Sequence, residues 1–399
     1  MAVPPRLIVS QSDVVSLPNM MIPFCRPSIT QLEKDYMAEA AQGKLCGDGP
    51  FTAKATSLFI EKQGIRNALL TSSGTHALEL AALLCDLEPG DEVILPSFTF
   101  SSTANAFLLR GAKLVFCEID PRTMNMDPKA AESLVTSRTK VIAPIDYAGV
   151  PCDIDAFRAI AKKCGARIVQ DAAQGVGSRY KGRACGADAD FACYSFHETK
   201  NYVMGEGGAI TFGSDEDLHQ AEIIREKGTD RSKFYRGEVD KYSWQRSGSS
   251  FLPSDILAAL LLAQLQRFDE IMESRMHVWN TYHDSFKALE DDGLLARPYI
   301  PDYAQHNAHC YFLMTRSLDE RNALLDYLRQ QGVGAVFHYI PLHSAPAGIA
   351  QGYKKEDLPL TEEYAGRLIR LPLFSDMAES DLFHIVDSVF SFYGKAAAL

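Results

Sequence analysis

The chain has 399 residues, of which 46% are hydrophobic and 23% charged, and its formal net charge at pH 7 is -11. This is ordinary globular composition, and the length predicts one large domain plus a smaller one. The negative charge argues against broad adhesion to nucleic acid or anionic lipid, and the lack of roughly 18 consecutive apolar residues argues against a membrane span.

The cysteines and the N-terminus indicate the cellular compartment of the protein. Nine cysteines are spaced singly without a C-x-x-C pair, as is typical of a reducing compartment, and no metal site is predicted. The opening MAVPPRLIVSQSDVVS lacks the basic start and the apolar core of about 7 to 15 residues that mark a secretory signal. We therefore expect a cytoplasmic protein.

From residue 67 onward, short apolar runs alternate with amphipathic stretches. The runs lie at 67–71, 91–96, 113–120, 140–147 and 167–171, and the helical stretches at 74–86, 100–111 and 154–165. Apolar strands joined by helices predict a parallel sheet covered by helices on both faces. Two further runs, 190–196 and 208–212, have no helix between them, so the sheet is predicted to be mixed.

The C-terminal part predicts a smaller α+β unit. A long helical pattern starts at Pro253 and Ser254 and is expected to form a spine between domains. It is followed by apolar or amphipathic stretches at 309–315, 318–332, 335–343 and 380–393. We place the boundary near residue 260, with a large domain and N-terminal arm at 1–260 and a small domain at 261–399.

Three polar clusters follow predicted strands, where ligands collect in parallel sheets. The first, residues 71–75, is a Gly/Ser/Thr turn that opens a helix. Its free backbone N–H groups and the helix dipole suit a phosphate, although a simple helix cap gives the same pattern. The second is Asp171, which follows the strand at 167–171. A buried acid there must be ionised and paired, protonated, or facing a polar cavity, and we expect a cationic neighbour. The alternative is that Asp171 caps the turn that follows.

The third cluster surrounds Lys200, in the stretch SFHETKNYVMGEGGAI. Most lysines are solvated surface charges. Here an aromatic strand precedes the lysine, and glycines that admit close backbone approach follow it. A desolvated lysine is more readily neutral, and its amine can attack a carbonyl in Schiff-base chemistry.

Together the clusters supply an amine, a carboxylate and a phosphate cradle, which are the groups that pyridoxal phosphate requires. An aromatic side chain at Phe100 is placed to stack on the cofactor ring, or belongs to the core. This combination indicates transamination.

The stretches SSGTHAL, PSFTFSSTANAF, DAAQ, SFHETKN and GEGGAI resemble the DegT/DnrJ/EryC1/StrS family of sugar aminotransferases. The resemblance extends from residues 22–29 to 337–346. It implies the fold-type I architecture of pyridoxal-phosphate transferases related to aspartate aminotransferase. Three stretches, 47–52, the HETKN and 248–254, are most similar to enzymes that aminate C4 of dTDP-4-keto-6-deoxyglucose.

The resemblance also implies roles for single residues. Lys200 would hold the cofactor covalently and Asp171 would pair with the pyridine nitrogen. The other implied cofactor contacts are Gln174 to the ring hydroxyl, Phe100 to the ring face, and Gly74, Thr75 and Ser195 to the phosphate. A homodimer with shared active sites is also implied.

Two parts of the sequence bear on the neighbouring subunit and the substrate. In the family's Gly-x-Asn-x-Arg stretch, which the neighbouring subunit contributes to the active site, this chain has Ser250 at the Asn position and Leu252 at the Arg position. The resemblance implies that Ser250 contacts the cofactor, whereas Leu252 does not match the family's Arg. His338 and His343 fall in a stretch that lies near the sugar nucleotide in the family. A buried structural role remains open for both histidines.

The implied reaction is transfer of an amino group, with L-glutamate as donor, to a nucleotide-linked keto sugar. Two alternatives stay open: amination at C3 of a dTDP-3-keto-6-deoxyhexose, and a non-catalytic regulatory protein that binds the cofactor. Some relatives replace the lysine with histidine and dehydrate their substrate, and Lys200 disfavours that branch.

Overall fold

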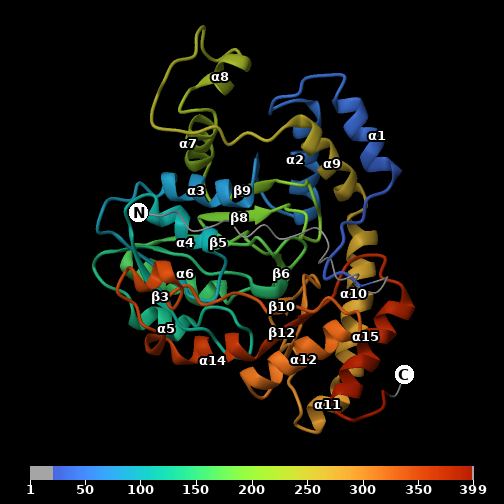
Figure 1. Cartoon of the computed structure of the whole chain (residues 1–399). Coiled ribbons are helices and arrows are strands. Elements are labelled where there is room, and N and C mark those ends of the chain that lie inside the picture. Colours follow the sequence, from blue (N-terminus) through green and yellow to red (C-terminus); the bar gives the residue numbers. More distant parts are fainter. Residues whose placement is uncertain (1–20, 398–399) are drawn as a thin grey trace, which may run out of the picture.

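The computed structural model describes residues 21–397. Its centre is a seven-stranded sheet (Figure 1). In spatial order the strands are β1 (Leu69–Thr71), β9 (Gly208–Phe212), β8 (Phe191–Ser195), β5 (Arg167–Asp171), β4 (Thr139–Ile142), β2 (Glu92–Pro96) and β3 (Lys113–Cys117). β9 runs antiparallel to both of its neighbours and the other pairs are parallel, so the predicted mixed sheet is confirmed.

Each central strand sends alternate side chains into two separate cores. In β2, Ile94 packs into one core while Val93 and Leu95 pack into the other. The same division occurs in β5, where Ile168 and Val169 face opposite sides. Because side chains alternate along a strand, an apolar run fits only a sheet that is buried on both faces.

Helices cover both faces of the sheet. One face carries α2 (Pro50–Gln63), α5 (Pro128–Ser133), α6 (Ile154–Cys164) and α9 (Asp255–Gln266). The other carries α3 (Gly74–Leu84), α4 (Ser101–Leu108) and α7 (Asp215–Arg225). α1 (Gln31–Ala40) packs on α9, and α8 (Arg231–Tyr235) projects away from the sheet (Figure 1).

The C-terminal elements surround a third core (Figure 1). They are α10 (Phe268–Ser285), α11 (Lys287–Asp291), α12 (Leu318–Gln330), α15 (Glu379–Phe392) and the antiparallel pair β11 (Tyr311–Met314) and β12 (Leu368–Leu371). Two further helices of this part are α13 (Pro346–Ile349) and α14 (Pro359–Arg367), and α14 packs on α12. A small antiparallel sheet joins β10 (Ala304–Gln305), β6 (Arg179–Tyr180) and β7 (Arg183–Ala184).

The predicted long helix is divided in two. Arg267 separates α9 from α10, with φ -96° and ψ 20°. Its guanidinium donates to the buried carboxylate of Glu33, 2.9 Å away, and to the Ser28 hydroxyl, 3.0 Å away. These contacts with residues far away in the chain stabilise the interruption between α9 and α10. The periodicity of the local sequence does not reveal such contacts.

The buried side chains change core along α10. Phe268 and Ile271 pack with the large sheet, whereas Val278 and Trp279 pack in the C-terminal core. The boundary near residue 260 stays a prediction, and we propose that the C-terminal unit begins within α10.

The N-terminal opening considered for a secretory signal lies outside the described residues. In the described part, no helix has the length and apolarity that crossing a membrane requires. All nine cysteines are free thiols.

Asp255 connects α9 to the start of α2. Its buried carboxylate accepts hydrogen bonds from the N–H groups of Phe51 and Thr52, at 3.2 and 2.7 Å, and from the Thr52 hydroxyl at 2.7 Å. An anion at a helix N-terminus is favourable, and the donors here are cut off from water.

We expect Asp255→Ala to lower the free energy of unfolding by about 2–4 kcal/mol, because it leaves buried donors without an acceptor. Chemical denaturation followed by circular dichroism measures the loss. The matched control is Asp291→Ala, which removes an exposed carboxylate paired with Lys287 and should change stability by less than about 0.5 kcal/mol. Equal effects of the two substitutions would contradict the capping role.

Candidate active site

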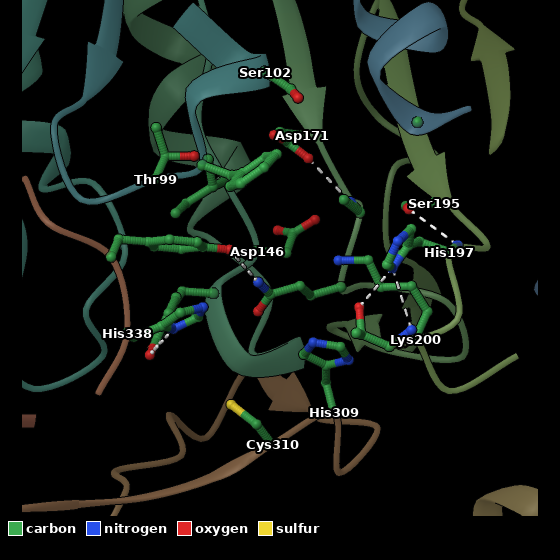
Figure 2. Close-up of a pocket in the computed structure, with 18 of the residues that line it drawn as sticks. Thr99, Ser102, Asp146, Asp171, Ser195, His197, Lys200, His309, Cys310 and His338 are labelled. Atoms are coloured by element: carbon green, nitrogen blue, oxygen red, sulfur yellow. Dashed lines mark hydrogen bonds between the residues drawn. The ribbon is translucent and has the colours of Figure 1, made fainter. Parts of the chain in front are cut away.

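A cavity of about 640 Å³ opens at the carboxyl ends of the parallel strands (Figure 2). Its wall includes eight residues that the sequence placed at the site: Gly74, Thr75, Phe100, Asp171, Gln174, Ser195, Lys200 and His338. In Figure 2, Lys200 lies between Asp171 on one side and His309 and Cys310 on the other. The cavity therefore combines side chains from the large sheet with side chains from the C-terminal elements.

Lys200 lies in the connection between β8 and β9. Backbone bonds hold the two arms of this connection together, from Phe196 N–H to Gly207 C=O at 2.9 Å and from Glu198 N–H to Gly205 C=O at 3.1 Å. Burial lowers the pKa of Lys200, and the charge of Asp171 opposes that change. The amine therefore loses its proton to reach the nucleophilic form more easily than an exposed lysine does.

Asp171 ends β5 and points into the same cavity. One carboxylate oxygen accepts from the Thr103 hydroxyl at 2.6 Å, and the other accepts from the Ala173 N–H at 3.1 Å. Burial raises the pKa of Asp171, while these bonds and the charge of Lys200 act in the opposite direction. The carboxylate is therefore fixed in direction and has a cationic neighbour, as the sequence predicted.

The turn after β1 forms a cradle at the start of α3. The Ser73 side chain caps the helix by accepting from the His76 N–H at 3.0 Å. This leaves the first helical N–H groups, at Gly74 and Thr75, without partners inside the helix. A Cβ added at Gly74 would come within 2.9 Å of the Ser195 Cβ, so β8 approaches too closely for any larger residue. The turn therefore contains both a helix cap and free N–H groups that suit an anion, so the two interpretations of this turn, cap and phosphate cradle, are compatible.

Phe100 and Gln174 complete the polar and aromatic wall. Phe100 is 59% exposed, and its ring centroid lies 6.3 Å from that of Tyr339, so it is no core residue. The Gln174 amide accepts from the Ala148 N–H at 2.7 Å and donates to the Tyr339 hydroxyl at 2.9 Å. These bonds fix the orientation of the side chain at the cavity wall.

Two histidines of the C-terminal part also line the cavity. His338 stacks on Tyr339 with centroids 3.6 Å apart and shares a 2.8 Å hydrogen bond with the Tyr147 hydroxyl. His309 shares a 3.0 Å hydrogen bond with Asn201. Burial lowers the pKa of both histidines well below the usual value, so both are neutral at pH 7.

The structure does not bring His343 or Ser250 to this cavity. His343 is fully buried, and its ring bonds the Ser97 hydroxyl at 2.7 Å, which is the structural role that the sequence left open. Ser250 lines a separate hollow of about 300 Å³ together with Lys44, Arg231 and Leu252. A substrate contact by His343 is therefore corrected to a packing role, and Ser250 makes no contact with the cavity of its own chain.

Comparison with known proteins identifies the family. The family model described as the DegT/DnrJ/EryC1/StrS aminotransferase family matches residues 27–390. The chain belongs to this family. It is therefore an aminotransferase, and the expected fold-type I architecture is confirmed.

Individual relatives within the family agree with this. The spore coat polysaccharide biosynthesis protein SpsC of Bacillus subtilis is 32% identical over 93% of this chain and 97% of its own length. The putative sugar aminotransferase Spr1654 of Streptococcus pneumoniae, solved in apo, PMP and PLP forms, is 26% identical. It superposes with a TM-score of 0.86 over 94% of this chain and 98% of that chain. The aminotransferase TlmJ of Streptoalloteichus hindustanus is 28% identical with a TM-score of 0.85, over 94% and 99% of the two chains.

Sequence reasoning missed three lining residues, His309, Tyr339 and Arg370. It also missed Thr103, whose buried hydroxyl donates to the Asp171 carboxylate. Thr103 carried a usable signal, because it lies in the first turn of the helix that Phe100 precedes, on the same edge of the sheet as Asp171. His309 and Arg370 carried none, because they reach the cavity only through the packing of the C-terminal elements onto the sheet.

Proposed function

We propose that the protein catalyses pyridoxal-phosphate-dependent transfer of an amino group from L-glutamate to a nucleotide-linked keto sugar. The observation that carries the proposal is the meeting, in one cavity, of a desolvated Lys200 amine and a fixed Asp171 carboxylate. The PLP and PMP forms of Spr1654 support the choice of cofactor.

The residues present fit the cofactor. The Gly74 and Thr75 N–H groups and the Ser195 hydroxyl would hold its phosphate, where the closeness of β8 to the α3 turn leaves room only for a glycine at 74. Phe100 would cover one face of the ring, and Gln174 would lie at its edge. When bound, pyridoxal phosphate supplies an aldehyde carbon and a ring that withdraws electrons from the substrate.

The chain's own groups then have distinct roles. The Lys200 Nζ would hold the cofactor between turnovers, and its amine would be the group that takes up and returns a proton during the transfer. The Asp171 carboxylate would favour a protonated ring nitrogen, and the Thr103 hydroxyl keeps that carboxylate in position. The apolar and aromatic wall, including Phe100 and Tyr339, excludes water from the transferring proton.

For the acceptor we propose dTDP-4-keto-6-deoxy-D-glucose, aminated to dTDP-4-amino-4,6-dideoxy-D-galactose. The support is the resemblance of residues 47–52, 197–201 and 248–254 to C4 aminotransferases of this kind, together with the relation to a polysaccharide biosynthesis protein. Amination at C3 of a keto sugar is the second candidate, because the same catalytic groups serve both positions.

A two-stage spectral experiment tests function and substrate. L-glutamate added to the yellow holoenzyme should bleach the absorption of the lysine-bound cofactor within seconds. Addition of dTDP-4-keto-6-deoxyglucose should restore the absorption at least about tenfold faster than its 3-keto isomer, because a misplaced carbonyl loses the near-attack geometry. Absorption unaffected by amino acids would favour a regulatory protein, and faster recovery with the 3-keto isomer would favour C3 chemistry.

We also propose that two copies form a homodimer with shared active sites, acting in the cytoplasm. Tyr235 lines the hollow that contains Ser250 and Leu252 and is 63% exposed, and Trp244, later in the chain, is 77% exposed. Burying such side chains against a second chain is favourable. Light scattering of the holoenzyme measures the oligomeric state.

A further inference from the structure

His309 is a histidine of the cavity wall that no part of the proposed cofactor site uses. In Figure 2 it lies on the opposite side of Lys200 from Asp171. Its ring is only half paired with the protein. Nδ1 lies 3.0 Å from the Asn201 Oδ1, whereas Nε2 has no hydrogen-bond partner within residues 21–397. Because the residue lines the cavity, the unpaired nitrogen is available to a ligand there.

Asn201 fixes which ring nitrogen of His309 carries the proton. The Asn201 Nδ2 donates to the backbone C=O of Asn307 at 2.7 Å, so the amide presents its oxygen to the His309 ring. An amide oxygen only accepts, and Nδ1 therefore has to carry the proton. Burial, followed by the charges of Lys200 and two arginines, lowers the pKa of His309 well below its usual value, so the ring takes up no second proton at pH 7. Nε2 keeps its lone pair and acts only as an acceptor.

The backbone around His309 is held on both sides. The Asn307 Nδ2 donates to the C=O of Gln174 at 2.7 Å. The buried Arg275 donates to the C=O groups of Ala308 and His309, at 3.2 and 2.6 Å. Ala308 itself has a φ of 50°, in the left-handed region that is unfavourable for alanine. Such a conformation persists only where its surroundings enforce it, so the position of the ring is built into the fold.

Two other buried histidines differ from His309 in their hydrogen bonds. His343 uses both ring nitrogens within the protein, because Nδ1 bonds the Ser97 hydroxyl at 2.7 Å and Nε2 lies 3.3 Å from the Lys355 C=O. His338 lines the cavity but has the opposite tautomer. The Tyr147 hydroxyl is buried and has to donate its proton, so the His338 Nδ1 accepts it at 2.8 Å and Nε2 carries the ring proton. The cavity wall therefore holds one histidine that only accepts and one that donates.

We propose that the His309 Nε2 accepts a hydrogen bond from the sugar hydroxyl on the carbon next to the carbonyl, and so selects a hydroxyketone as the amino-group acceptor. The inference rests on the proposed function. The Lys200 amine has to reach the reacting carbon, so a substrate group that meets the ring beside it belongs to that carbon or to its neighbour. A carboxylate and a carbonyl have no proton to donate, and the amino group is consumed in the reaction. The hydroxyl is the donor that remains, and in dTDP-4-keto-6-deoxyglucose it is the one on C3.

The tautomer of His309 is measured without turnover. NMR of the holoenzyme, with isotope-labelled histidine ring nitrogens, distinguishes protonated from unprotonated nitrogens. His309→Gln and His338→Gln identify the two rings by the loss of their signals. In wild-type protein, His309 should carry its proton on Nδ1 and His338 on Nε2. Asn201→Ala removes the acceptor of the Nδ1 proton and should give a mixture of both His309 tautomers. A wild-type His309 with its proton on Nε2 would overturn the inference.

A binding measurement identifies the ligand group. The probes are dTDP-6-deoxyglucose, which has no carbonyl and cannot react, and its 3-deoxy analogue, each titrated by calorimetry into the holoenzyme. Wild-type protein should bind the first about tenfold more tightly, because the analogue leaves the His309 lone pair without a donor. His309→Leu should reduce this preference to less than about threefold, and His309→Gln, whose amide oxygen can accept, should retain part of it. The matched control is His384→Gln, which alters an exposed ring that donates to the Gln331 C=O at 2.8 Å and should keep the full preference.

Binding of dTDP alone shows whether a variant is intact. Because dTDP lacks the sugar, its affinity should change less than about threefold in each His309 variant. If His309→Leu also loses dTDP binding, the preference measured in His309→Gln and the wild-type tautomer decide in its place. A preference for the 3-hydroxyl that persists in His309→Leu, or that wild-type protein lacks, would overturn the inference. Wild-type protein that binds no sugar nucleotide would instead contradict the proposed function.

Discussion

Replacing Lys200 with alanine should lower turnover by at least about 10⁴-fold, because the side chain serves both as the covalent holder of the cofactor and as the proton carrier. Borohydride should also no longer fix the cofactor to the chain. Mass spectrometry of the reduced wild-type protein should locate the modification at Lys200, and the same treatment should leave the variant unmodified.

The controls for this prediction separate charge from nucleophilicity. Lys200→Arg keeps a positive charge near Asp171 but cannot hold an aldehyde, so it should be as inactive as the alanine variant. Lys181→Ala removes a half-exposed amine paired with Asp155 and should keep full turnover. If Lys200→Ala transaminated at the wild-type rate, the assignment of the site would be wrong.

Asp171→Asn should lower turnover on the order of 10²–10³-fold, the usual effect of removing one group that stabilises developing charge. The amide keeps the size and the bond from the Thr103 hydroxyl, but it supplies no negative charge to the ring nitrogen. The ratio of bleaching rates, measured by stopped flow with saturating L-glutamate, gives the effect directly.

The wild-type dependence on pH provides a second measurement for Asp171. Burial raises its pKa, so the carboxylate is lost at a higher pH than for an exposed aspartate. Activity should fall on the acid side as the pH drops through this raised value, and Asp171→Asn should lack that acid limb. Asp255→Asn alters another buried carboxylate outside the cavity wall and should keep the limb. An unchanged acid limb in Asp171→Asn would assign the titration to another group.

The sequence was sufficient to predict the large sheet and the position of polar residues at its edge. Strands such as 91–96 and 167–171 are apolar on both faces and alternate with helices, which is a local pattern with one good solution. Because parallel strands end at the same edge of a sheet, Asp171 and the turn at Gly74 were expected at one edge. β9 and β8 lie between their strands in the sheet. Lys200 followed from the short connection between two neighbouring strands.

The features that could not be predicted from the sequence depend on contacts between distant parts of the chain. β12 is four residues long, and its partner β11 lies more than 50 residues earlier, so no local signal placed Arg370 at the cavity. The break at Arg267 depends on Glu33 in the N-terminal part. The sequence placed His343 in a stretch expected near the substrate, but it could not predict the direction of the ring. The hydrogen bond to the Ser97 hydroxyl determines that direction.

The cavity wall is contributed by two sets of elements that meet along α10. The proposed cofactor contacts lie at or after the ends of β1, β2, β5 and β8, whereas His309, His338 and Arg370 all come after the point at which α10 leaves the core of the large sheet. Change in the C-terminal third can therefore alter which molecules are accepted while the chemistry stays intact. A chimera that takes this third from a relative of different specificity would test whether specificity and chemistry separate in this way.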